Sequence, residues 1–175
     1  YQDVTDPDYS EPAGGWKWLD GKKEEKLGSN IWVNNEPNDT SNSTSKGYIY
    51  ISSNDVRTAD RPNSLSYKYI VEFTDGRTTQ AGFTRLNGTF EGTNYFVSDA
   101  AVTWDVAKST SESLGGNLLV VNSSQEWGWI RGQEPDWDDF VNSQPHWIGL
   151  SQDPNTYDFA EPQGGWRWVN GVPLQ

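Results

Sequence analysis

The chain contains neither cysteine nor methionine among its 175 residues. Without cysteine it can form no disulfide framework and no thiolate metal site, and a cysteine nucleophile is excluded. The absence of methionine even at position 1 indicates a processed chain or a piece of a longer one. Side-chain packing, rather than covalent cross-links, therefore has to hold the fold together.

Basic residues are few, with 13 lysines and arginines against 25 acidic residues and a net charge of −12. This balance argues against nucleic acid, polyphosphates and anionic membranes as partners. The sequence has no run of about 18 apolar residues and no charged-then-apolar leader. It therefore predicts no membrane insertion and shows no signal peptide.

Apolar residues make up only 33% of the chain, but they include 10 Trp, 8 Tyr and 6 Phe. Aromatic side chains each bury a large area, so a core built on aromatics is feasible despite the low apolar count. The composition is that of a globular protein.

One segment occurs twice, 150 positions apart. Residues 2–21 align without a gap on residues 152–171, with 10 identities in 20 positions, and Glu-Pro, Gly-Gly and Trp-x-Trp stay in phase. Such a match predicts tandem repeats of about 150 residues. The chain then holds the end of one domain (1–76), a linker (77–89) and the beginning of the next domain (90–175).

The first half has the pattern of short strands joined by irregular loops. Aromatic and β-branched runs at 31–33, 48–51 and 67–73 are bounded by Asn, Asp, Ser and Pro clusters. The polar stretch 34–47 between them predicts a long loop. The Gly- and Thr-rich stretch 74–89 predicts the linker, with short strand character around Phe83.

The second half carries the predicted helices. Thr103 is a plausible N-cap for a helix that stops at Gly115-Gly116, and Trp104, Ala107, Ser111 and Leu114 would share one face. Residues 117–122 predict a buried strand. Ser123 and Glu126 have capping-box spacing for a second, shorter helix. Strands are predicted at 95–97 and 146–150.

The order of these motifs resembles a C-type lectin-like domain of the cysteine-free, microbial type. The first part of such a domain is similar to TWDVAKSTSESLGGNLLVVNSSQEW, HWIGL and GGWRWVNG, and its remaining part to GGWKWLDG, IWVNNEPND, YIYIS, SND and YKYIVEF. The resemblance implies an α+β fold with mixed, mostly antiparallel sheets, two helices and a long loop region.

The resemblance also implies a calcium ion and a glycan ligand. In the family, Glu and Asn flanking a proline bind calcium and sugar hydroxyls together, in the order that favours mannose and glucose; here they are Glu36 and Asn38. The family's second ligand pair corresponds to Asn54 and Asp55. Ca²⁺ takes six to eight oxygen ligands, which these side chains begin to supply.

Two departures keep an alternative open. Ser53 replaces the usual Trp before Asn-Asp, and Lys46-Gly47 replaces an acidic ligand expected just before the following strand. Asp39 can compensate in part, which gives the metal set Glu36, Asn38, Asp39, Asn54 and Asp55. The alternative is a polar surface loop without metal.

Other motifs predict structure rather than chemistry. Trp16 and Trp18, like Trp166 and Trp168, alternate with period two, which is more typical of a core strand than of a sugar-stacking platform. The acidic run 134–139 predicts a solvated loop. His146, the single histidine, has no catalytic partner at a supporting spacing, so we expect no enzyme.

Two functions therefore remain open for an extracellular or cell-surface protein. The repeat favours a structural or adhesive fibre or a surface-layer subunit, in which copies of the chain join head to tail. The Glu-Pro-Asn motif favours a soluble or surface calcium-dependent lectin of mannose or glucose type. An adhesive fibre that also binds glycan would combine the two.

Overall fold

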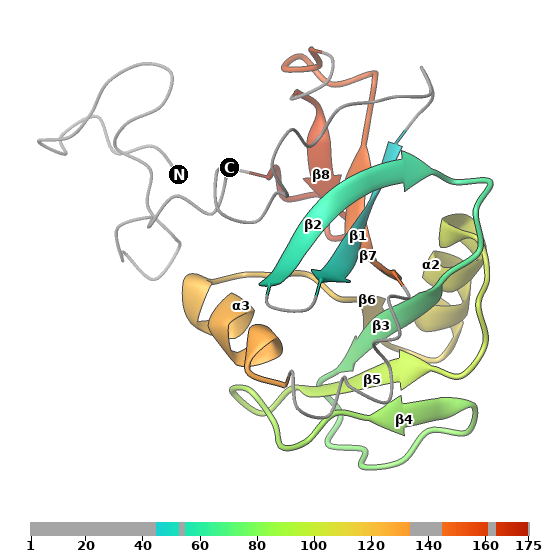
Figure 1. Ribbon diagram of the computed structural model, residues 1–175, viewed down its shortest axis with the longest axis vertical. Coiled ribbons are helices and arrows are strands. Elements are labelled where there is room, and N and C mark those ends of the chain that lie inside the picture. Colours follow the sequence, from blue (N-terminus) through green and yellow to red (C-terminus); the bar gives the residue numbers. More distant parts are fainter. Residues whose placement is uncertain (1–44, 53–54, 134–144, 161–163, 175) are drawn as a thin grey trace, which may run out of the picture.

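A computed structural model describes residues 45–52, 55–133, 145–160 and 164–174 of the chain (Figure 1). The predicted strand at 31–33 and the acidic run 134–139 lie outside these residues, as do Trp16 and Trp18.

The described strands form one sheet in the order β2-β1-β7-β3-β5-β4, with β6 paired to β3 and β8 paired to β7. The pairing of β3 with β7 is parallel and the other pairings of these strands are antiparallel. The strands are β1 (Ser45–Ser52), β2 (Asp55–Pro62), β3 (Lys68–Phe73), β4 (Phe83–Arg85), β5 (Asn94–Ser98), β6 (Asn117–Leu118), β7 (His146–Gln152) and β8 (Trp166–Trp168).

Two helices accompany the sheet. Helix α2 spans Trp104–Ser113 and α3 spans Ser124–Arg131. Together with the sheet they confirm the predicted α+β class, and the mostly antiparallel sheet is consistent with a C-type lectin-like fold.

Both helices begin where the sequence predicts. Thr103 is the N-cap of α2, with Gly115 in the left-handed conformation after its end. The Ser123 hydroxyl caps α3 by accepting from the Glu126 amide at 3.0 Å. Glu126 itself reaches back to the Asn122 amide rather than to the cap residue. The predicted buried face of α2 is also confirmed, since Trp104, Ala107 and Ser111 are buried.

The core has two parts, which the alternation of side chains along β3 separates. Tyr69, Val71 and Phe73 of β3 belong to the part that contains Trp104 and Ala107 of α2. Ile70 belongs to the other part, which contains Trp127 and Ile130 of α3 and the two tryptophans of β8. Strand β3 therefore contributes to the packing of both helices.

Strand boundaries differ from the sequence prediction in three places. Strand β1 begins at Ser45, so the predicted loop 34–47 ends too late; pairing with β2 and β7 extends the strand into a polar segment. Strand β2 was not predicted, because its charged sequence has no apolar alternation. The predicted strand 117–122 is wrong beyond Leu118. There the Val120 amide donates to the Glu72 side chain instead of to a neighbouring strand.

Strands from both sides of the predicted linker share the sheet. Strand β3 pairs with β5 and β7, and β1 pairs with β7, so residues of 1–76 and of 90–175 pack together within one chain. The linker itself contains β4, which confirms the predicted strand character around Phe83. The division into two incomplete domains remains a prediction.

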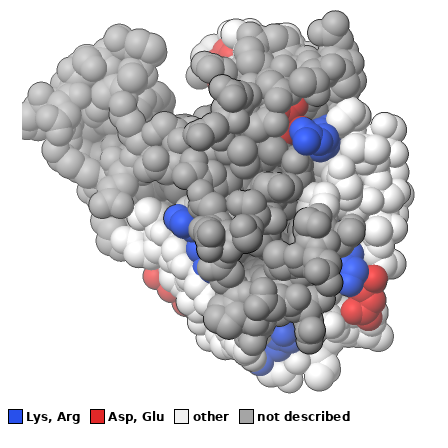
Figure 2. Space-filling view, in the orientation of Figure 1, with Lys and Arg blue, Asp and Glu red and all other residues white. Residues whose placement is uncertain are grey.

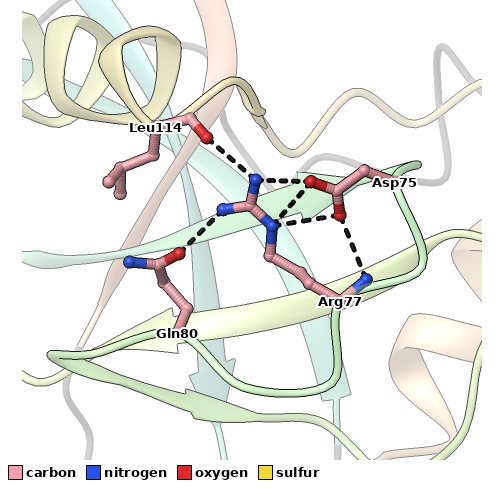
Figure 3. Close-up of polar contacts among 4 residues, drawn as sticks. All are labelled: Asp75, Arg77, Gln80 and Leu114. Atoms are coloured by element: carbon pink, nitrogen blue, oxygen red, sulfur yellow. Dashed lines mark hydrogen bonds and ion pairs between the residues drawn. The ribbon is translucent and has the colours of Figure 1, made fainter.

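Arg77, at the start of the predicted linker, forms hydrogen bonds that reach the end of α2 (Figure 3). Its guanidinium donates to Asp75 at 2.8 and 3.0 Å, to the Gln80 side chain at 2.7 Å and to the Leu114 carbonyl at 3.1 Å. It also lies 3.9 Å from the centre of the Phe73 ring. The segment after β3 is therefore tied to the second half of the chain.

Candidate functional site

Only one of the five predicted calcium ligands, Asp55, lies among the described residues. Glu36, Asn38, Asp39 and Asn54 lie outside the described residues, and Asp55 is the first residue of β2, opposite Ser52 at the end of β1. Asp55 therefore stands at the tip of a β-hairpin, where the two residues 53–54 connect the strands. The ligand set as a whole remains a prediction.

The position of Lys46-Gly47 bears on the missing acidic ligand. Both residues lie in β1, opposite Arg61 and Asp60, at the end of the hairpin far from its tip. Six residues of strand separate Lys46 from Ser52, which corresponds to about 20 Å. The Lys46 backbone thus lies at the opposite end of β1 from the hairpin tip.

A second group of polar residues joins β3, β5 and α3, and the sequence motifs did not predict it. The Tyr95 hydroxyl donates to Oε1 of Glu126 at 2.7 Å, and the Asn122 amide donates to Oε2 at 2.7 Å. Glu126 is only 3% exposed. Oε2 of Glu72 accepts from the Val120 amide at 3.2 Å, so the two carboxyl groups bind the same short segment, 120–122.

Burial changes the protonation of this group. Desolvation, with a smaller contribution from the neighbouring charge of Glu126, raises the pKa of Glu72 to about 8 against the opposing hydrogen bond from the Val120 amide. Desolvation also raises the pKa of Glu126, against the hydrogen bonds from Tyr95 and Asn122. The pKa of Tyr95 rises through its burial and its bond to Glu126. Glu72 is therefore largely protonated at neutral pH.

These two glutamates offer fewer ligands than a cation requires. Ca²⁺ takes six to eight oxygens, and no group of three or more acidic, His or Cys side chains suited to a metal occurs among the described residues. The described geometry is that of two carboxyl groups hydrogen-bonded to the backbone amides of segment 120–122, with Tyr95 donating to one of them. A signal for Glu72 did exist in the sequence, because it is an acid that interrupts the apolar run YIVEF.

The described tryptophans are core residues. Trp166 and Trp168 are 2% and 5% exposed in β8, which confirms the prediction that their alternation marks a core strand. Trp129 is partly buried against Tyr95 and Phe90. Among the described tryptophans, Trp129 is partly exposed and the others are buried.

Charges on the visible surface are mixed. Figure 2 shows basic and acidic side chains interspersed over the described part of one face. That surface offers no extended basic patch to a phosphate-rich partner. None of the described helices is long and apolar enough to span a bilayer.

Comparisons with known proteins point to one family of domains. No protein-family model matches the chain, and no solved structure matches it significantly. Among curated proteins, the C-type lectin domain family 4 member M of Nomascus concolor and the CD209 antigen of Symphalangus syndactylus are 28% identical over 85 residues, or 49% of this chain. The C-type lectin domain family 4 member E of Homo sapiens has the same identity over the same length.

The chain covers only a small part of these relatives. The matched segment is 18%, 19% and 33% of their respective lengths. Taken with the α+β fold and its mostly antiparallel sheet, the matches support the presence of a C-type lectin-like domain in this chain.

Proposed function

We propose that the chain is an extracellular or cell-surface C-type lectin-like module that binds glycan through a calcium ion. Its relatives are named as C-type lectins, a class that binds rather than catalyses. The observation that carries the proposal is the hairpin of β1 and β2, which places Asp55 at its tip directly after Asn54.

The chain that precedes β1 is long enough to bring the Glu-Pro-Asn motif to the same place. Strand β1 runs for about 23 Å from Ser45 to Ser52. Seven residues from Asn38 to Ser45 can span at most about 25 Å. Glu36 and Asn38 can therefore reach the hairpin tip and face Asp55. Carboxylate and amide oxygens from both segments would then surround one Ca²⁺ ion.

A calcium titration tests the proposal. We expect calorimetry on chelator-treated protein to show saturable binding, and the double variant Glu36→Gln with Asp55→Asn to lose it, because two carboxylate ligands become neutral. The same variant should lose binding to mannose-type glycans, measured in calcium.

A matched control separates ligation from general charge. The double variant Glu112→Gln with Asp99→Asn removes two exposed carboxylates from α2 and from the segment after β5. We expect it to bind calcium like the parent chain. Equal loss in both double variants, or no heat in the parent, would reject the calcium site.

A second candidate is a structural or adhesive fibre, or a surface-layer subunit, built from tandem copies joined head to tail. The repeated segment at 2–21 and 152–171 favours it. Tandem copies would also raise a weak single-site glycan affinity by avidity. An assembly whose size in solution is unchanged by chelator and sugar would favour this candidate.

A further inference from the structure

Strand β8 occupies a defined place at one end of β7. It pairs antiparallel with the last residues of β7, Leu150–Gln152 (Figure 1). Trp166 and Trp168 are buried there in the same core part as Ile148. We call residues 152–171 the C-terminal copy, residues 2–21 the N-terminal copy, and this place the β7 seat.

The β7 seat requires glycine at particular positions of its occupant. Gly165 and Gly171 have φ values of +77° and +84°, which L side chains rarely adopt. A Cβ on Gly164 would lie 2.2 Å from the Asp158 carbonyl oxygen. The N-terminal copy has glycine at all three equivalent positions, 14, 15 and 21.

The C-terminal copy also brings two buried tryptophans and one ion pair. The N-terminal copy carries Trp16 and Trp18 at the spacing of the buried pair. Arg167 donates to Asp158 at 2.5 Å across the C-terminal copy. At the equivalent positions the N-terminal copy has Lys17 and Asp8, which are again opposite charges nine residues apart.

The buried glutamine at the start of the C-terminal copy also has an equivalent in the N-terminal copy. Gln152 is 3% exposed and donates to the Gly164 carbonyl at 2.9 Å. Gln2 stands at the equivalent position. Each of these features by which the described C-terminal copy fits the seat thus has a chemical equivalent in the N-terminal copy.

We propose that the N-terminal copy of the same chain is an alternative occupant of the β7 seat and exchanges there with the C-terminal copy. The occupant comes from the same chain because residues 22–44 tether it to β1, which pairs with β7. Twenty-three residues can reach at most about 80 Å, which is long enough for this connection. A segment of the same chain has an effective concentration in the millimolar range, above that of a second chain at micromolar concentration.

The two copies are continued by different residues. After Gly171 the chain continues as Val172-Pro173-Leu174, and Leu174 packs on the core and donates its amide to the Trp166 carbonyl at 2.9 Å. After Gly21 it continues as Lys22-Lys23-Glu24. The apolar tail favours the C-terminal copy, so changing it shifts the exchange.

Disulfide trapping tests the proposal, because the chain has no cysteine of its own. Ser151 pairs with Arg167 across β7 and β8. Residues directly opposite each other in such a pair are close enough for a disulfide. The variant Ser151→Cys with Arg167→Cys should therefore form a disulfide, and it reports the C-terminal copy. The variant Ser151→Cys with Lys17→Cys should form one within the monomer when the N-terminal copy occupies the seat.

Further variants make the result specific. Adding Leu174→Glu should raise the yield of the disulfide between positions 17 and 151 about fivefold, by weakening the resident copy. Adding Trp16→Ala and Trp18→Ala should abolish it. A chain with Ser109→Cys on the exposed side of α2 and Lys17→Cys is the control for random contact.

The yield is read by mass spectrometry of non-reduced monomer at low protein concentration. No disulfide above the Ser109→Cys control would overturn the proposal, and so would a disulfide found only in cross-linked dimers. The reaction is run in chelator without sugar, so its outcome does not depend on the proposed calcium-dependent function.

Discussion

Glu72 and Glu126 make the free energy of unfolding depend on pH. Both are carboxyl groups whose pKa the fold raises, so the folded chain binds protons that the unfolded chain releases. For such groups the free energy of unfolding falls as pH rises from the unfolded pKa through the folded one. For Glu72 this window runs from about 4.5 to about 8.

We predict that Glu72→Gln removes much of this dependence. The amide oxygen can still accept from the Val120 amide, and no charge has to be buried. At pH 9 the variant should be about 1–3 kcal/mol more stable than the parent, and at pH 4 close to it. Denaturant unfolding at pH 4, 7 and 9 measures the difference.

Glu112→Gln is the matched control, because Glu112 is an exposed carboxylate paired with Lys108 on α2. Its unfolding free energy should follow the pH dependence of the parent. A Glu72→Gln variant that keeps the full pH dependence would show that this carboxyl is not responsible for it.

At the scale of elements, local signals explain which parts of the fold were predictable. Both helices carry their start signals in a few adjacent residues, and their limits follow from Thr103, Ser123 and the Gly-Gly stop. Strand β2 carries no such signal, since its pairing with β1 depends on residues outside its own sequence. The end of β6 depends on Glu72, which lies 48 positions before Val120.

The candidate site was predictable to a smaller extent. Motif order predicts Asp55 as a ligand; the structure shows that it begins β2, and its role as a ligand stays a prediction. The pair Glu72 and Glu126 was not found, because its proximity arises from the packing of α3 beside β3 and β5. Sequence motifs report neighbours along the chain, whereas this group joins residues from three separate elements.

Two glycines should respond to alanine in opposite ways. In Gly149→Ala the new Cβ would lie 2.9 Å from the carbonyl oxygens of Leu118 and Leu119, which are backbone atoms in the middle of the sheet. We expect a loss of about 1–3 kcal/mol in unfolding free energy from this overpacking. Gly128→Ala lies on the exposed side of α3 with no atom within 4 Å. It should add about 0.5–1 kcal/mol.

Thermal and denaturant unfolding of both variants measure these changes. Equal effects of the two substitutions would mean that β7 does not pass as close to residues 118 and 119 as described.

At the scale of the whole molecule, the two halves share their core. Ile70 and Val71 of β3 pack into opposite parts of it, between residues that lie beyond the linker. Phe73 meets Phe96 edge-on, with ring centres 5.5 Å apart, across β3 and β5. Contacts of this kind do not depend on the covalent connection between the halves.

We therefore predict that the chain survives a cut in its linker. A specific protease site inserted between the exposed Thr78 and Thr79 should allow cleavage into two pieces that still co-elute in size-exclusion chromatography. They should separate only in denaturant. Pieces that elute apart in buffer would contradict the shared sheet.

Phe96→Ala provides the control for the cut chain. The side chain is fully buried and touches the other half, so its loss should cost about 3–5 kcal/mol. The cut variant should dissociate at concentrations where the cut parent remains whole.

The pairing of β1 with β7 also sets the order of events during synthesis. Lys46 pairs with Ser151, about a hundred positions later. At 5–20 residues per second, a ribosome needs roughly 5–20 s to make the intervening chain. During that interval β1 has left the ribosome without one of its two neighbours. Nascent chains of this protein would therefore expose an unpaired strand edge for seconds, which is long enough for chaperones to bind it.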